Sequence, residues 1–341
     1  MSHLYVATNG LSVWSCDAMG AKISRMPSGT GMYSGSQVWA LASHRDLPNM
    51  LFAGTDSGLY RLDQRENFWT HIPSPTDTMM VTAIAIAADN PQVMILGTQP
   101  SALFRTDDGG HTWRQLNAPV KPYTSSGFYG GEKDSKTKTP PANAVKHWTR
   151  VTQVLFDPKD SRQVWAGVEI DGAWRSRDGG DSWERISDSL DTQDIHGLAC
   201  IDDAKGAQKL FITSPSGIHV SADAGTHWRH IRLESPWQYT RSILERMDHT
   251  GVMFVTNGNG PPGSGGKLFR SRDHGETWNE VSLPGTVESS AYFLGVHHAD
   301  PNLIYLAATL GQIYRSEDGG ETWSAVKRRL GEIRAITWLP G

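Results

Sequence analysis

The chain has 341 residues, 38% of them hydrophobic and 20% charged, which is enough apolar sequence to bury a sizeable core. A formal net charge of -4 without any basic run argues against a nucleic-acid-binding surface. No stretch is long and apolar enough for a membrane span, and the N-terminus lacks a signal-peptide pattern. Two cysteines outside any CxxC motif make no disulfide framework. We therefore expect a cytoplasmic protein that binds neither nucleic acid nor membrane.

Tryptophans recur about every 44 residues and divide the chain into seven similar units. Each unit predicts four antiparallel strands: an apolar inner strand, a strand ending in Gly-Thr-like residues, a strand ending in Arg-Ser, and a short outer strand. In chain order the units cover residues 4–26, 37–72, 81–116, 149–187, 194–231, 239–281 and 291–326. The repeat predicts an all-β, seven-bladed β-propeller in one domain of residues 1–341.

A nine-residue phrase closes the third strand of five units. Its copies are RTDDGGHTW (105–113), RSRDGGDSW (175–183), VSADAGTHW (220–228), RSRDHGETW (270–278) and RSEDGGETW (315–323). The shared Asp can accept backbone N–H groups inside a tight turn, and the shared Gly can take the positive φ that such a turn needs. The phrase thus predicts a hairpin turn, after which a Trp packs on the next unit.

This phrase resembles the Asp-box of the sialidase-like, BNR-repeat propellers, a superfamily that also includes sortilin and the photosystem assembly factors. The resemblance implies the propeller fold and places the Asp-box turns on the face away from the functional one. The resemblance does not imply sialidase activity. The nearest match to the Arg-Ile-Pro motif of sialidases, Arg25-Met26-Pro27, ends an outer strand, so a standard sialidase is not expected.

The first unit lacks an inner strand, and the last segment of the chain supplies a spare one. Residues 332–339 read as an inner strand with no sheet after them. We expect this strand to complete the first blade and close the ring, because an open array would leave sheet edges exposed.

Two insertions interrupt the period, at residues 117–147 and at 257–266. Links between blades, and links between second and third strands, emerge on the same face of a propeller. Both insertions should therefore border one mouth of the central channel, opposite the Asp-boxes. Long loops in a compact domain are often functional, although a tolerated surface insertion explains them equally well.

Three arginines should converge at that mouth. When the inner strands are aligned on the turns that end them, Arg150, Arg241 and Arg334 occupy equivalent positions at the strand starts, in blades four, six and one. Guanidinium groups bind carboxylate, sulfate or phosphate bidentately, which suggests a small anionic ligand. The plainer interpretation is that each Arg pairs with a local acid, such as Glu169 or Glu245, and joins neighbouring blades.

Other candidate groups lie near the same strand starts. Glu169 replaces a small residue in the link of blade four, and His196 lies one position after the aligned site in blade five. We consider these two as catalytic acid and base. Candidate substrate-binding aromatics are Trp148, Tyr239 and Tyr292.

No cofactor is expected from the sequence. The histidines show no HxH or HExxH spacing, so no transition-metal site is predicted, while calcium at loop carboxylates is left open. The glycines of GGEKDSKT lack the strand and GK[ST] ending of a phosphate loop. Two functions remain: a hydrolase or lyase acting on a small anionic, sugar-acid-like substrate, or a non-catalytic propeller that grips a protein or peptide with the loop 117–147.

Overall fold

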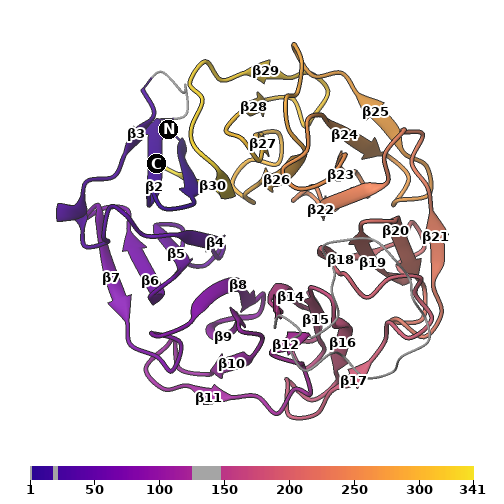
Figure 1. Ribbon diagram of the computed structural model, residues 1–341, viewed down its shortest axis with the longest axis horizontal. Helices are drawn as coiled ribbons and strands as arrows, with labels where there is room; N and C mark the ends of the chain where they lie inside the picture. The colour runs from indigo at the N-terminus through magenta and orange to yellow at the C-terminus, as the bar shows by residue number, and fades with distance from the viewer. Residues whose placement is uncertain (1, 18–21, 125–146) are drawn as a thin grey trace.

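The computed structural model describes residues 2–17, 22–124 and 147–341. Within these residues, seven four-stranded antiparallel sheets surround a central axis, which confirms the predicted seven-bladed propeller (Figure 1). The described part holds no α-helix, only one 3-10 turn, η1 (Ser28–Thr30), and hence no helix that could cross a membrane.

The blades succeed one another around the ring, each with its inner strand toward the axis. Blade one contains β30 (Ile333–Pro340), β1 (Ser2–Thr8), β2 (Val13–Asp17) and β3 (Ser24–Arg25); blade two, β4 (Val38–Ala42), β5 (Met50–Thr55), β6 (Gly58–Asp63) and β7 (Phe68–Ile72); blade three, β8 (Met80–Ala87), β9 (Asn90–Gln99), β10 (Leu103–Thr106) and β11 (Arg114–Gln115).

The later blades repeat this order. Blade four contains β14 (Val151–Phe156), β15 (Val164–Val168), β16 (Gly172–Ser176) and β17 (Glu184–Arg185); blade five, β18 (Gly197–Asp202), β19 (Gln208–Ser214), β20 (Gly217–Ser221) and β21 (Arg229–Ile231); blade six, β22 (Tyr239–Glu245), β23 (Met253–Gly258), β24 (Gly266–Ser271) and β25 (Asn279–Val281); blade seven, β26 (Ala291–Gly295), β27 (Ile304–Ala308), β28 (Ile313–Ser316) and β29 (Ser324–Ala325).

The hydrophobic core lies between the blades rather than on the axis. Each of seven apolar clusters in the described chain combines side chains of two neighbouring sheets, for example Val81 and Leu96 of blade three with Phe52 of blade two. Since a sheet buries apolar side chains on both faces in this way, its second strand contains a nearly continuous hydrophobic run. The axial cavity is lined by both polar and apolar side chains.

The ring is closed by the two ends of the chain, as predicted. Strand β30 pairs antiparallel with β1, with Leu4 opposite Trp338 and Val6 opposite Ile336. The indole of Trp338 is 2% exposed and donates to the carbonyl of Leu303 in blade seven, 3.1 Å away. One strand from the C-terminus therefore completes blade one and joins it to blade seven.

The Asp-box turns form as the sequence predicts. In blade three, Asp108 Oδ1 accepts the N–H of Thr112 at 2.8 Å and the hydroxyl of Thr106 at 2.7 Å, while Gly110 has a φ of 96°. These hydrogen bonds keep the pKa of Asp108 well below its usual range, led by the Thr112 hydroxyl. The predicted packing of the box Trp on the next unit is wrong, because the indole lies against the preceding blade: that of Trp228 donates to the carbonyl of Ile186 in blade four, 2.8 Å away.

The two predicted insertions differ in how much of each the structure describes. Most of the first, residues 125–146, lies outside the described residues. At its base, β12 (Tyr123–Thr124) and β13 (His147–Trp148) form a two-stranded ribbon. The second, residues 257–266, extends the link between β23 and β24, where the N–H of Ser290 donates to the carbonyl of Pro262.

Replacement of Trp338 by Ala tests the closure. We expect the free energy of unfolding to fall by about 3–5 kcal/mol, as for other buried aromatic truncations, measured by urea denaturation. Trp148→Ala serves as the control: this indole is 55% exposed and its loss should change stability by less than about 0.5 kcal/mol. Equal effects of the two substitutions would contradict the closing role of β30.

A buried histidine predicts how stability depends on pH. Burial, with the charge of neighbouring His298, lowers the pKa of His297 from 6.5 to about 4. Between these pH values the unfolded chain binds a proton that the folded chain does not, so protonation favours unfolding. The free energy of unfolding is therefore not reduced by His297 above pH 6.5 and falls as the pH is lowered toward 4. His297→Asn keeps an acceptor for the N–H of Ala299 and removes the titration.

The wild type should therefore lose about 4 °C more of its melting temperature than His297→Asn between about pH 7.5 and 4.5, as measured by calorimetry. His111→Asn, at an exposed position, is the control and should behave like the wild type. Parallel pH profiles for all three proteins would show that His297 does not carry this dependence.

Candidate functional site

The starts of all seven inner strands surround one cavity of about 260 Å³ on the axis. It is lined by residues of β4, β8, β14, β22, β26 and β30 and by His196, just before β18. Because every inner strand runs in the same direction relative to the axis, residues at equivalent positions meet at this mouth. The three predicted arginines, Arg150, Arg241 and Arg334, all line it.

Two of these arginines are paired with acids. Arg150 Nε lies 2.8 Å from Glu169 Oε2, and its NH2 group lies 3.2 Å from Oε1, a bidentate ion pair. Arg334 lies 2.5 Å from Glu332. Burial, and then the nearby guanidinium charges of Arg150 and Arg241, lower the pKa of Arg334 despite Glu332, so the three cations act on one another.

Arg241 differs from the other two. It makes no ion pair with any carboxylate of the described chain; its NH1 group donates to the hydroxyl of Tyr239 at 3.3 Å. Its guanidinium lies over the ring of Tyr292, 4.6 Å from the centroid, and the two tyrosine hydroxyls are 2.9 Å apart. The rings hold this cation in place by cation–π attraction but do not neutralise it.

Trp39, which the sequence did not single out as a site residue, forms another part of the wall. The guanidinium of Arg334 lies 4.0 Å from its ring centroid and that of Arg150 lies 5.4 Å away. Trp39 Nε1 and Arg334 Nε are buried donors without a hydrogen-bond partner among the residues described. A bound ion or water is one explanation for donors left unpaired in a buried polar site.

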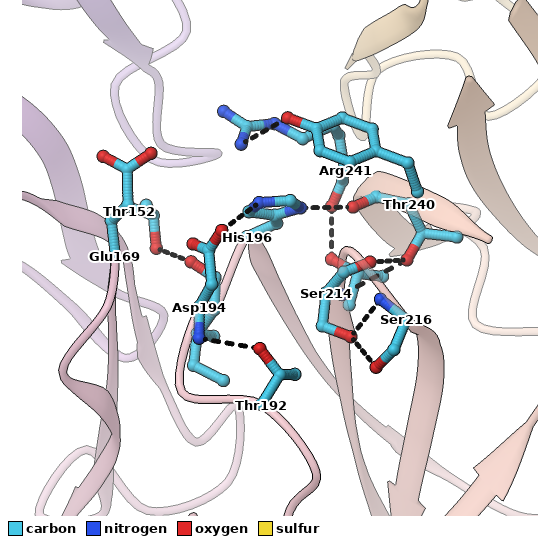
Figure 2. A network of polar contacts seen from close by, with 12 residues as sticks. Thr152, Glu169, Thr192, Asp194, His196, Ser214, Ser216, Thr240 and Arg241 are labelled. Carbon is cyan, nitrogen blue, oxygen red and sulfur yellow. Dashed lines mark hydrogen bonds and ion pairs between the residues drawn. The ribbon is translucent and has the colours of Figure 1, made fainter. Parts of the chain in front are cut away.

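His196 lines this cavity but is almost wholly buried in its wall. Its side chain is 1% exposed and lies between two oxygen atoms, Asp194 Oδ2 at 3.3 Å from Nε2 and the carbonyl of Thr240 at 2.6 Å from Nδ1 (Figure 2). The ring also packs on Tyr239, with centroids 4.8 Å apart. Because both nitrogens are engaged, the geometry makes His196 a positioning residue for Tyr239 and the start of β22.

The protonation of this pair is determined by its hydrogen bonds. Burial, with the charge of Arg241, lowers the pKa of His196; burial raises that of Asp194, but the contact with His196 outweighs it and lowers the pKa. A neutral ring that donates Nδ1–H to Thr240 would point a lone pair at an ionised carboxylate. The contact with Thr240 places a proton on Nδ1, so a hydrogen bond between Nε2 and Asp194 Oδ2 requires a second proton. This geometry, against the lowered pKa of His196, leaves the pair with no net charge.

Only some of the remaining predicted residues lie at the cavity. Tyr292 lines the cavity, Tyr239 borders it through Arg241, and Glu169 reaches it through Arg150. Trp148 is not among the lining residues; it stacks edge-on with Tyr123 in the ribbon beside the mouth. Asp194 and Glu332 were missed by the sequence reasoning, although each lies two residues from an aligned or predicted position and could have been found by that spacing.

Comparison with known proteins identifies the repeat. Residues 314–325, which include the last Asp-box, match the family model described as BNR/Asp-box repeat. The chain thus contains an Asp-box repeat of this family within a seven-bladed propeller. Its architecture agrees with a GH74 xyloglucanase from Xanthomonas campestris at a TM-score of 0.64 and 15% identity, over 98% of this chain and 52% of that one. It also agrees with YCF48 from Cyanidioschyzon merolae at 0.56 and 14% identity, over 88% of each chain.

Curated sequences similar to this propeller are named as xyloglucanases. A probable oligoxyloglucan-reducing end-specific xyloglucanase of Neosartorya fischeri is 24% identical over 76% of this chain and 42% of its own length. A xyloglucanase of a Paenibacillus species is 24% identical over 60% of this chain and 21% of its own. The chain thus spans less than half the length of these relatives.

Proposed function

We propose that this propeller binds a ligand carrying one carboxylate at the mouth of its channel, and that it acts on that ligand as a hydrolase of the carbohydrate class. The observation that carries the proposal is Arg241, a guanidinium without an acid partner among the described residues, on the wall of a cavity. The xyloglucanase relatives support the reaction class, although xyloglucan itself is uncharged.

The charge balance of the mouth favours a monoanion. Arg150 is offset by Glu169 and Arg334 by Glu332, and the pair of Asp194 and His196 is neutral as a whole. Arg241 leaves one positive charge in a partly desolvated cavity, where a single carboxylate gains most from a bidentate contact. Within the described structure, the three arginines therefore act as one uncompensated cation flanked by two ion pairs.

The size and walls of the cavity favour one ring-sized group. A volume of about 260 Å³ is at the small end for a ligand site and suits a single sugar ring or the end of a longer chain. Trp39, Tyr292 and Phe293 supply aromatic surface for the C–H face of such a ring. A uronic acid, which has one ring and one carboxylate, combines both properties.

Glu169 is the group that we assign to the reaction. Its side chain is 24% exposed and is held at the edge of the cavity by its ion pair with Arg150, and a carboxylate so placed can activate water or remove a proton. Removal of the proton on the carbon beside a uronate carboxylate, with departure of the glycosidic oxygen from the next carbon and formation of a double bond between the two carbons, would instead make the protein a lyase. Neutralising that carboxylate at Arg241 would acidify the C–H bond that breaks. Hydrolase and lyase differ in their product.

Arg241→Gln tests the binding site. Glucuronate should bind the wild type, detected by calorimetric titration, while glucose should not. The variant should bind glucuronate about 10- to 100-fold more weakly, because a hydrogen bond to a charged group contributes about 1.5–3 kcal/mol. Arg114→Gln, which removes a guanidinium paired with Asp181 on the Asp-box side, is the matched control and should bind normally. Undiminished binding by Arg241→Gln would refute the site.

Turnover tests the reaction separately. Acidic and neutral oligosaccharides are incubated with the protein, and both new reducing ends and the ultraviolet absorbance of an unsaturated uronate are monitored. We expect release of reducing ends from acidic substrates without that absorbance, and a loss of kcat of about 10²- to 10⁴-fold in Glu169→Gln with ligand binding retained. The absorbance would indicate the lyase instead. Binding without any turnover would refute the enzyme and leave the binding site standing.

The second candidate is a non-catalytic propeller that holds the carboxylate of a peptide. It is favoured by the ion pairing of Glu169 and Glu332 and by the engaged nitrogens of His196, which leave few free groups for acid–base chemistry. A structural relative of the same fold is described as YCF48 bound to D1 peptide, at a TM-score of 0.52 and 14% identity. A role for the loop 117–147 in gripping such a partner remains a prediction.

A further inference from the structure

A cluster of metal-ligating side chains lies on the outer part of blade five, away from the residues that line the mouth. His219 on β20 and His230 on β21 are cross-strand partners, and Asp191 comes from the link that leads from β17 to β18. One ligand atom of each lies within 4.8 Å of the other two. Three separate stretches of sequence therefore meet at one point of the blade (Figure 1 labels β20 and β21).

We propose that Asp191, His219 and His230 bind a divalent transition-metal ion, with zinc the best fit. Two imidazoles and a carboxylate form a three-ligand set in which a water molecule completes a tetrahedron. Zinc bonds of about 2.0–2.1 Å place the donor atoms about 3.3 Å apart. Nε2 of His219 and Oδ1 of Asp191 are 3.2 Å apart, so this edge of the tetrahedron is already present.

The remaining geometry requires a rotation of the His230 ring out of its stack on His219. The two imidazole rings stack with centroids 4.7 Å apart and an interplanar angle of 11°. Nε2 of His230 now contacts the carbonyl of Ser216 at 2.9 Å, and this exposed side chain can turn its ring toward the cluster. Asp191 is also exposed, which leaves a path for the metal and for water.

The charges around the cluster suit a cation. The carboxylate of Asp191 supplies a negative charge, and the buried ring of His219 is held beside it, with Nε2 3.2 Å from Oδ1. Nδ1 of His219 is buried without a partner among the described residues. Metal binding at Nε2 would leave a proton there without an acceptor, and the loss of that supporting hydrogen bond weakens binding about 10- to 100-fold relative to a fully supported site.

Blade two provides an internal comparison. Its strands have the same register, and Tyr60 faces His71 across β6 and β7 where His219 faces His230 in blade five. Asp77 lies 3.2 Å from His71, so blade two contains the carboxylate and one imidazole but a phenol in place of the second. The complete set belongs to blade five, and the substitution His219→Tyr converts it to the arrangement that blade two already folds with.

The experiment uses the full chain after dialysis against EDTA. Zinc chloride is titrated by calorimetry, and cobalt(II) is added separately to record its visible spectrum. We expect one zinc per chain at this cluster, a rise in melting temperature, and the intense cobalt bands of a tetrahedral N/O site. Magnesium, which prefers octahedral oxygen ligands, should not compete.

Variants separate this cluster from chance binding at other histidines. His219→Tyr and His230→Gln should each weaken zinc binding at least about tenfold and abolish the cobalt bands, while circular dichroism shows an intact fold. His227→Asn is the control: this histidine is exposed and contacts Asp223 in an Asp-box, and its loss should leave zinc binding unchanged. Absence of zinc binding to the wild type, or full binding by both cluster variants, would overturn the proposal.

Discussion

The pairing of β1 with β30 is the constraint on which the rest of the molecule depends. Each hydrophobic cluster of the described chain lies between two blades, so every sheet needs a neighbour on both sides. The pairing completes blade one and supplies the surface that blade seven packs against. The same strand carries Trp338 into that core and Arg334 to the mouth. Closure of the ring and assembly of the site are therefore one event.

Placing equivalent strand starts around a narrow axis creates an electrostatic problem. Three guanidiniums converge there, and their mutual repulsion in a partly buried space would favour opening of the ring. Glu169 and Glu332 neutralise two of them, while the rings of Tyr292 and Trp39 lie against the cations. Arg241 alone keeps an uncompensated charge within the described structure. This residual charge, not the number of arginines, is the basis on which a ligand with one carboxylate is proposed.

Periodic features of the fold are the ones that the sequence predicts. The Asp-box residues, the seven inner strands and the closing strand recur at a fixed spacing, so alignment of the repeats placed Arg150, Arg241 and Arg334 at one opening. Contacts that do not recur from blade to blade could not be predicted by this alignment. The aligned strands show that His196 lies near the mouth, yet its burial depends on Asp194 and Thr240, whose side-chain and carbonyl directions no repeat determines. Its assignment as a base therefore rested on position alone.

The histidine pair of blade five is a second feature that residue spacing in the sequence did not predict. A search for metal sites by short spacing finds ligands on one turn or one loop, whereas His219 and His230 are brought together by the register of two strands and Asp191 by a link between blades. Comparison of equivalent positions between blades is the signal that remains. Blade two has Tyr60 opposite His71, and blade five differs from it by an added nitrogen donor at a buried site. In a repeat protein each blade can thus be compared with the others at equivalent positions. A polar side chain that replaces the residue of the other blade, without a gain in packing, points to function.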